Sequence, residues 1–320
     1  MLNRTAGLRD VMPHVISIRD FSRDEIDRIL DRAAELEPIA HGGSSDLLAG
    51  RILATLFHEP STRTRLSFDA AMKRLGGSVI DFGSIEGSAV SKGENLADTI
   101  AVVSGYADAI VLRHPKEGAA RMASEFSRVP IINAGDGAGQ HPTQTLLDLY
   151  TIRKESTLDR VKIAIVGDLK YGRTVHSLVY ALSLYNAEIH LVSPDQLKVP
   201  ESLTNDLSES GTRITETTDL DEVIDYVDVM YLTRIQKERF PDPNEYRTVA
   251  GSYRITEETL KRVKDDLIIM HPLPRVDEID HGVDSSRHAV YFKQSFYGVP
   301  VRMAILSMVM GDGTAATGRW

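Results

Sequence analysis

Three hydroxyl groups and one guanidinium stand in four consecutive residues, Ser61, Thr62, Arg63 and Thr64. They follow an apolar run at residues 52–57, so we expect a strand to end and a helix to begin there. A helix N-terminus presents unbonded N–H groups and the positive end of the helix dipole, which favours a phosphate. A serine N-cap is the simpler interpretation of any single Ser-Thr-Arg. Four anion-seeking side chains in one turn favour a phosphate site.

Three further arginines stand at the ends of apolar runs. They are Arg113 after residues 109–112, Arg173 after 161–166 and Arg234 after 227–232. Open α/β sheets bind ligands at the carboxyl edge of their strands, so we expect these side chains to gather with Arg63. Four arginines in one cleft repel one another unless an anion with several charges lies among them. The chemistry indicated is electrostatic activation of an anionic substrate.

His141 and Gln144 are three residues apart and share one face of a helical turn that Pro142 is suited to begin. Two interpretations stay open. His141 caps its own helix, or a neutral imidazole and the Gln144 amide position a carbonyl substrate.

A glycine-flanked loop carries two polar residues, Ser88 and Lys92, without an evident structural task. Ser91 and Glu94 fit a capping box that would begin a helix over residues 94–106. A single loop lysine is a weak signal of chemistry.

The second half of the chain has comparable loops after its apolar runs. Residues 167–173, GDLKYGR, lack the G-x-G-x-x-G pattern of dinucleotide binding. The block His-Pro-Leu-Pro-Arg at 271–275 ends the last run, where a cis bond before Pro274 is plausible.

The composition restricts the classes of protein. The chain has 320 residues, a formal net charge of −9, 42% hydrophobic residues and no cysteine. This excludes disulfides, thiolate catalysis and cysteine-ligated metals, and an acidic chain is a poor general binder of nucleic acid. The N-terminus has no signal-peptide pattern, and no apolar run reaches the roughly 20 residues that cross a bilayer. We expect a cytoplasmic protein without membrane or nucleic-acid partners.

Short apolar runs alternate with amphipathic stretches. We expect strands at residues 52–57, 78–82, 109–112, 130–133, 161–166, 188–192, 227–232 and 267–270, and helices at 63–75, 94–106, 117–128, 144–153 and 174–185. Runs rich in Val, Ile and Leu are typical of parallel strands buried on both faces. The pattern predicts an α/β fold with two doubly wound domains, each a parallel sheet flanked by helices.

We place the domains at residues 1–140 and 141–293, with four strands in each. The apolar stretch 294–310 is expected to form a helix, so that residues 294–320 or so complete the first domain. The active site is expected in the cleft between the domains.

Five blocks together resemble the catalytic chains of the aspartate carbamoyltransferase family over essentially the whole chain. The blocks are F-x-E-P-S-T-R-T-R at 57–65, S-K-G-E-x-L-x-D-T at 91–99, H-P-T-Q at 141–144, R-I-Q-x-E-R-F at 234–240 and H-P-L-P-R at 271–275. The resemblance implies transfer of the carbamoyl group of carbamoyl phosphate to the α-amine of L-aspartate, the committed step of pyrimidine (UMP) biosynthesis. It implies no cofactor and no metal.

The resemblance also assigns the site. Carbamoyl phosphate would contact Ser61, Thr62, Arg63, Thr64, Arg113, His141, Gln144, Leu273 and Pro274. Aspartate would contact Lys92, Arg173, Arg234, Gln236 and Leu273. The catalytic groups would be Arg63, Thr64, Lys92, Arg113, His141 and Gln144. Ser88 and Lys92 would come from a neighbouring subunit, which implies a homotrimer with shared sites.

Two alternatives carry different chemistry. Ornithine carbamoyltransferases place a cysteine in the block equivalent to 271–274, whereas this chain has none, and a subsite with Arg234 suits a dicarboxylate better than a diamino acid. In a non-catalytic phosphate-binding module, His141, Gln144 and Lys92 would have no task. Some relatives are bare trimers and others pair with zinc-bearing regulatory chains, and the sequence leaves that choice open.

Overall fold

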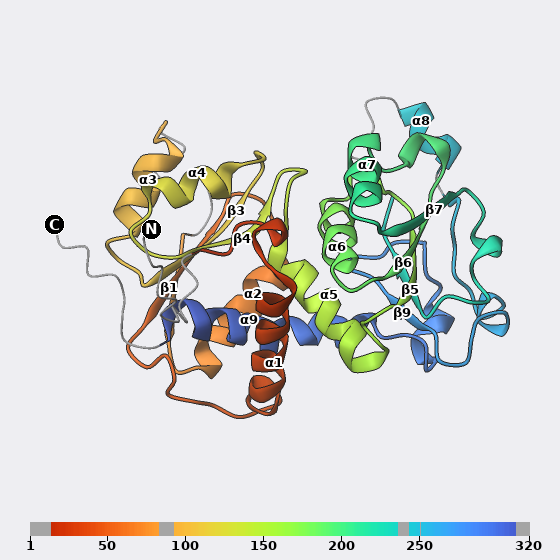
Figure 1. The fold of residues 1–320 in the computed structure, drawn as a ribbon. Helices are drawn as coiled ribbons and strands as arrows, with labels where there is room; N and C mark the ends of the chain where they lie inside the picture. The colour runs from red at the N-terminus through yellow and green to blue at the C-terminus, as the bar shows by residue number, and fades with distance from the viewer. Residues whose placement is uncertain (1–13, 83–92, 236–242, 250, 312–320) are drawn as a thin grey trace, which may run out of the picture. The chain divides into compact units, whose positions relative to one another are not determined.

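The computed structural model describes residues 14–82, 93–235, 243–249 and 251–311. The chain forms two compact units (Figure 1). Unit 1 is built from Met1–Ile16, Asp31–Gly137 and Val299–Trp320, and unit 2 from Ser17–Leu30 and Ala138–Gly298.

Unit 1 contains a parallel sheet in the order β2-β1-β3-β4. Its strands are β1 (Ile52–Phe57), β2 (Ser78–Asp81), β3 (Ala109–His114) and β4 (Ile131–Asp136). The helices in this part of the chain are α1 (Arg23–Ala40), α2 (Thr62–Arg74), α3 (Leu96–Val103) and α4 (Ala119–Phe126). Residues of α3 and α4 pack with alternate residues of β1 and β3, among them Ala54, Leu56 and Leu112, in one apolar cluster.

Unit 2 contains a parallel sheet in the order β7-β6-β5-β8-β9. Its strands are β5 (Lys162–Val166), β6 (Glu188–Val192), β7 (Arg213–Thr217), β8 (Val229–Leu232) and β9 (Ile268–Met270). The α-helices are α5 (Pro142–Glu155), α6 (Arg173–Ser183), α7 (Glu201–Glu209), α8 (Pro243–Val249) and α9 (Tyr291–Met310), the last of which enters unit 1 at Val299. Short 3₁₀ helices are η1 (Ile18–Asp20), η4 (Asp195–Leu197), η5 (Leu220–Glu222), η7 (Thr259–Lys261) and η8 (His281–Ser285).

The predicted fold class and the predicted strands are confirmed, but the expectation of four strands in each sheet is wrong for unit 2. The additional strand, β7, has the sequence Arg-Ile-Thr-Glu-Thr and lies at the edge of the sheet. Because an edge strand exposes most of its side chains, it needs no apolar run. The apolar runs therefore do not predict it, and the sequence pattern does not predict helices α1, α7 and α8 either.

The predicted start of α3 is also wrong. The N-cap is Asn95, whose side-chain oxygen accepts a hydrogen bond from the Asp98 N–H at 2.9 Å. Glu94 accepts instead from the Thr99 hydroxyl at 2.7 Å. Ser91, the other half of the expected capping box, lies outside the described residues. Asparagine is as good an N-cap as serine, and the nearer one to the apolar turn is used.

The central strands are buried on both faces, as the apolar runs predict; Leu53, Ala54 and Leu56, for example, are all inaccessible. In unit 2 the residues from Pro142 to Ile152 of α5 are all buried. Within the described part of the chain, no helix combines the length and apolar character needed to cross a membrane.

Candidate functional site

In each sheet the direction in which successive strands are added reverses once. The predicted site arginines lie at or after the ends of the two strands that flank this reversal. In unit 1 the chain goes from β1 to β2 on one side and then to β3 on the other, so the reversal lies between β1 and β3. In unit 2 the reversal lies between β5 and β8. The helices that follow such strands leave a crevice at the carboxyl edge, which is where α/β sheets bind ligands.

In unit 1, β1 leads directly into the first turn of α2. Ser61 is the N-cap residue by position, yet its side chain makes no cap hydrogen bond, so the simple capping interpretation is not supported. Arg63 is exposed and has neither a hydrogen bond nor an ion pair within the described residues, whereas Arg65 pairs with Asp81 at 3.3 Å. Thr64 is buried beside it. The turn therefore offers uncommitted donors at a positive helix end.

Arg113 lies beside this turn, at the end of β3 and in register with Phe57. Its Nη1 donates to the carbonyl of Ala134 at 3.2 Å, and its Nε lies 3.4 Å from the Glu59 carboxylate. These contacts hold the guanidinium at the strand end. The turn after β1 and the end of β3 thus present two cations at one reversal.

Two arginines flank the reversal in unit 2. Arg173 is the first residue of α6 after β5, and Arg234 follows β8 by two residues; both are half-buried. The two strand ends approach closely at Gly167, which has φ +119° and where a Cβ would lie 2.2 Å from the Thr233 carbonyl oxygen. Only glycine fits there. The sequence prediction that four arginines stand at strand ends is confirmed within each unit.

His141 and Gln144 begin α5. His141 occupies the N-cap position but makes no side-chain cap hydrogen bond, so the self-capping interpretation is not supported. Its side chain is buried. The side-chain nitrogen of Gln144 donates to the Asp148 carboxylate, one turn later, at 2.8 Å.

The loop after β9 has an unusual backbone. The bond between Leu273 and Pro274 is cis, as the sequence suggested, and Leu273 has φ +54°, which non-glycine residues rarely adopt. The Leu273 N–H donates to His271 Nδ1 at 2.8 Å, and His271 Nε2 lies 2.8 Å from Glu278. The His271 imidazole therefore fixes the backbone of the loop by a hydrogen bond.

The Glu278 carboxylate fixes the other end of this loop. Burial raises its pKa, but hydrogen bonds from His271 and from backbone N–H groups outweigh burial and lower it to about 2. The N–H groups of Val276 and Asp277 both donate to its second oxygen at 3.0 Å. Glu278 is thus an ionised anchor at neutral pH.

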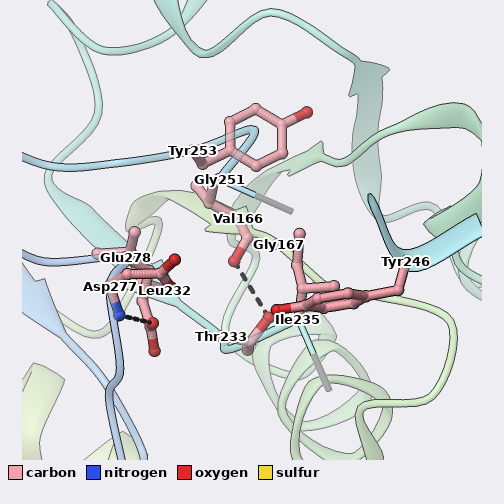
Figure 2. Close-up of a pocket in the computed structure, with 10 residues that line it drawn as sticks. All are labelled: Val166, Gly167, Leu232, Thr233, Ile235, Tyr246, Gly251, Tyr253, Asp277 and Glu278. Atoms are coloured by element: carbon pink, nitrogen blue, oxygen red, sulfur yellow. Dashed lines mark hydrogen bonds between the residues drawn. The ribbon is translucent and has the colours of Figure 1, made fainter. Parts of the chain in front are cut away.

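A small hollow opens in unit 2 at the carboxyl ends of β5 and β8. Figure 2 shows Gly167, Thr233 and Ile235 on one side of it and the carboxylates of Asp277 and Glu278 on another. The Thr233 hydroxyl donates to the Val166 carbonyl at 3.1 Å, which ties the ends of β5 and β8 together. Because two carboxylates line the hollow, it does not suit a dicarboxylate.

Three predicted site residues, Ser88, Lys92 and Gln236, lie outside the described residues. The described residues contain no cluster of three or more His, Cys, Asp or Glu with the geometry of a metal site.

Two family models cover almost all of the chain. Residues 13–154 match "Aspartate/ornithine carbamoyltransferase, carbamoyl-P binding domain", and residues 159–309 match "Aspartate/ornithine carbamoyltransferase, Asp/Orn binding domain".

The chain belongs to the aspartate/ornithine carbamoyltransferase family.

Within this carbamoyltransferase family, several aspartate carbamoyltransferase catalytic subunits are similar to this chain. That of Methanothrix thermoacetophila is 68% identical over 299 residues, which cover 93% of this chain and 98% of that protein. That of Methanocaldococcus jannaschii is 60% identical over 304 residues, 94% of this chain and 99% of that protein. The resemblance stated from the five sequence blocks is confirmed.

Solved structures agree with the fold. The M. jannaschii aspartate transcarbamoylase catalytic subunit has a TM-score of 0.87 at 60% identity and covers 93% of this chain and 98% of its own. The Trypanosoma cruzi enzyme, in complex with N-(phosphonacetyl)-L-aspartic acid, has a TM-score of 0.90 at 42% identity and covers 95% and 98%.

Sequence reasoning missed the buried groups that hold some of the predicted site residues in place. Asp148 contacts Gln144, Tyr231 and Gln294, and Glu278 contacts His271. The one available signal was the position of Asp148, four residues after Gln144 and so on the same helical face. Glu278 gave none, because its role depends on the folded loop.

Proposed function

We propose that the chain transfers the carbamoyl group of carbamoyl phosphate to the α-amine of L-aspartate, releasing phosphate and N-carbamoyl-L-aspartate. The observation that carries this conclusion is the placement of one arginine at or after the carboxyl end of each of the four strands that flank the two order reversals. A phosphate and two carboxylates are the anions that this set can neutralise. The family membership supplies the reaction class.

Unit 1 supplies the phosphate-binding groups. Ser61, Thr62, Arg63 and Thr64 receive the phosphate with backbone N–H groups of α2. This assignment is supported by Ser61, whose side chain makes no cap hydrogen bond, and by Arg63, which forms neither a hydrogen bond nor an ion pair with any described residue.

We assign the carbamoyl group to a second set of residues. Thr64, Arg113 and His141 donate to its carbonyl oxygen, and Gln144 and the Pro274 carbonyl accept from its amine. Donors placed where negative charge develops lower the barrier to the tetrahedral intermediate, and one such donor typically contributes a factor of about 10²–10³ in rate.

Arg173 and Arg234 bind the two carboxylates of aspartate, and Gln236 and Lys92 contribute further contacts. The Leu273 carbonyl orients the attacking amine. The positive φ of Leu273 supports this role, because a backbone held in a sparsely populated conformation aims its carbonyl in a fixed direction.

The reaction then needs no cofactor. The aspartate nitrogen forms a bond to the carbamoyl carbon, the bond from that carbon to the phosphate oxygen breaks, and the amine proton passes to the departing phosphate. Holding both substrates in line removes much of the entropic cost of a bimolecular step, up to about 7–11 kcal/mol.

We assign the binding of carbamoyl phosphate to residues 1–140 with the C-terminal helix, and the binding of aspartate to residues 141–293.

We also propose a cytoplasmic homotrimer in which Ser88 and Lys92 reach the site of a neighbouring subunit. Exposed apolar side chains on two elements of unit 1 that pack together, Leu66 on α2 and Ile80 on the edge strand β2, support a subunit contact there.

Light scattering during size exclusion tests the trimer by its mass. A monomer would remove the assignment of Ser88 and Lys92 to a neighbour's site, and a mass above three chains in extracts but not for the purified chain would indicate separate regulatory chains.

A colorimetric assay for carbamoylated product tests the reaction. With carbamoyl phosphate present, we expect product with L-aspartate and none with L-ornithine. Product with ornithine alone would overturn the assignment of Arg173 and Arg234, and no product with either would overturn the proposed function.

A further inference from the structure

Asp148 is a buried carboxylate on which three side chains converge. It is inaccessible to solvent. Its Oδ1 accepts from the side-chain nitrogens of Gln144 at 2.8 Å and Gln294 at 2.7 Å, and its Oδ2 accepts from the Tyr231 hydroxyl at 2.9 Å. A buried carboxylate is costly unless donors surround it, so this arrangement is specific to the ionised form.

The directions of these hydrogen bonds are fixed by chemistry. The backbone N–H of His271 can only donate, and it donates to Gln294 Oε1 at 2.8 Å. The NH₂ group of the Gln294 side chain must therefore face Asp148. Burial, and then the charge of Asp148, raises the pKa of Tyr231, so its hydroxyl keeps its proton and donates. An ionised carboxylate only accepts, and therefore Gln144 must also turn its NH₂ toward Asp148.

The orientation of Gln144 matters for the substrate. With its NH₂ committed to Asp148, the Gln144 amide presents its oxygen to a ligand. The amine of a carbamoyl group carries N–H donors, and its nitrogen lone pair is delocalised, so it needs an acceptor. The opposite orientation would place two donors against each other.

We propose that Asp148 is a positioning residue that selects the carbamoyl group by holding the Gln144 amide with its oxygen toward the substrate amine. This inference rests on the proposed function. Through Gln294 and the His271 N–H, the same carboxylate is also tied to the loop that carries Leu273 and Pro274. Through Tyr231, which shares a hydrogen bond with Thr174, it is tied to the start of α6 beside Arg173.

The test compares carbamoyl phosphate with acetyl phosphate, in which a methyl group replaces the amine. Asp148→Leu removes the acceptor at similar size. We expect its affinity for carbamoyl phosphate, measured by calorimetry, to fall at least about tenfold and its affinity for acetyl phosphate to change less than about threefold. Asp148→Asn is the matched control, because its amide oxygen still accepts from both glutamines while its NH₂ donates to Tyr231. It should keep carbamoyl phosphate affinity within about threefold.

Equal losses for both ligands in a folded Asp148→Leu protein would show a merely structural role and overturn the proposal, as would unchanged binding of carbamoyl phosphate. The proposed function fails separately, if the unaltered chain forms no carbamoyl aspartate.

A second variant covers the case in which Asp148→Leu does not fold. Gln144→Glu places a second carboxyl against Asp148, and the two must share a proton to avoid like-charge repulsion. We expect its carbamoyl phosphate affinity, relative to the unaltered chain, to fall about tenfold between about pH 6 and about pH 9. A ratio independent of pH would place Asp148 away from Gln144 and overturn the proposal.

Discussion

The Nε2 of His271 lies 2.8 Å from the carboxylate of Glu278, a residue seven positions further along the chain. Between them runs the loop with the Leu273–Pro274 bond, and both side chains also bind its backbone N–H groups. The pair therefore closes the loop as a ring of side-chain and backbone contacts. Its strength depends on the charge of Glu278.

Acid should destabilise the chain through Glu278. Because its pKa is lowered from 4.5 to about 2 in the folded state, the carboxylate contributes stability that is fully present above about pH 4.5 and is lost as the pH falls toward 2. A shift of this size corresponds to a free energy of about 3 kcal/mol. Glu278→Gln should lower the free energy of unfolding by that order at pH 7, measured in urea, and the difference from the unaltered chain should shrink below pH 4.

Asp277→Asn is the control, since Asp277 is the exposed neighbour of Glu278. It should unfold like the unaltered chain throughout. A Glu278→Gln protein with unchanged stability at pH 7 would contradict the anchoring role.

Arg63 and Arg65 provide a matched pair for the phosphate assignment. Arg63→Ala should weaken carbamoyl phosphate binding by about a hundredfold, because it removes a charge-assisted contact to the phosphate. Arg65 is on the same helix, and Arg65→Ala, which removes a surface ion pair with Asp81 of β2, should change binding less than about threefold. Isothermal calorimetry with carbamoyl phosphate separates the two, and equal losses would move the phosphate away from Arg63.

Arg234→Ala should raise the KM for aspartate at least about tenfold and lower kcat, while carbamoyl phosphate binding stays nearly intact. The reason is that its guanidinium is assigned to an aspartate carboxylate and to no part of carbamoyl phosphate. Steady-state kinetics with varied aspartate measures the effect. Arg262→Ala, which breaks an exposed ion pair with Asp221, is the control. An aspartate response like that of the control would remove Arg234 from the site.

Leu273→Gly should leave the melting temperature within about 2 °C and lower kcat by about tenfold. Glycine adopts φ +54° without a steric cost, which offsets the greater freedom it gives the unfolded chain, but it no longer holds the carbonyl direction. Arg160→Gly, at a second positive φ of 58° on an exposed turn, should leave kcat unchanged. Full activity of the Leu273 variant would contradict the orienting role of its carbonyl.

The sequence predicts the parts of this molecule in which local pattern and burial agree. Central strands such as β1 and β5 are mostly apolar and are therefore predicted, whereas β7 is mostly polar, lies at an exposed edge and is not predicted. The N-cap of α3 is Asn95 and not the predicted Ser91. Several residues near the start of this helix are adequate caps, and which of them is used depends on how the turn packs.

The same limit applies to the site. Residues that meet a ligand, such as Arg63 and Gln144, stand in blocks that chemistry and family resemblance single out. Residues that orient them, such as Asp148 and Gln294, are separated by about half the chain and acquire their roles only when folding brings them together. A single sequence does not show which distant residues come into contact in the folded chain.

The two order reversals have a consequence for comparing distant proteins. The units share no sequence repeat, yet each places an arginine at the end of both strands beside its reversal. The location of a ligand-binding cation is thus set by the sheet topology. It can be retained after most of the surrounding amino acids have been substituted. In an unfamiliar doubly wound sheet, the places to inspect for a bound anion are the ends of those two strands, the loops that follow them and the first turn of the next helix, whatever the rest of the alignment suggests.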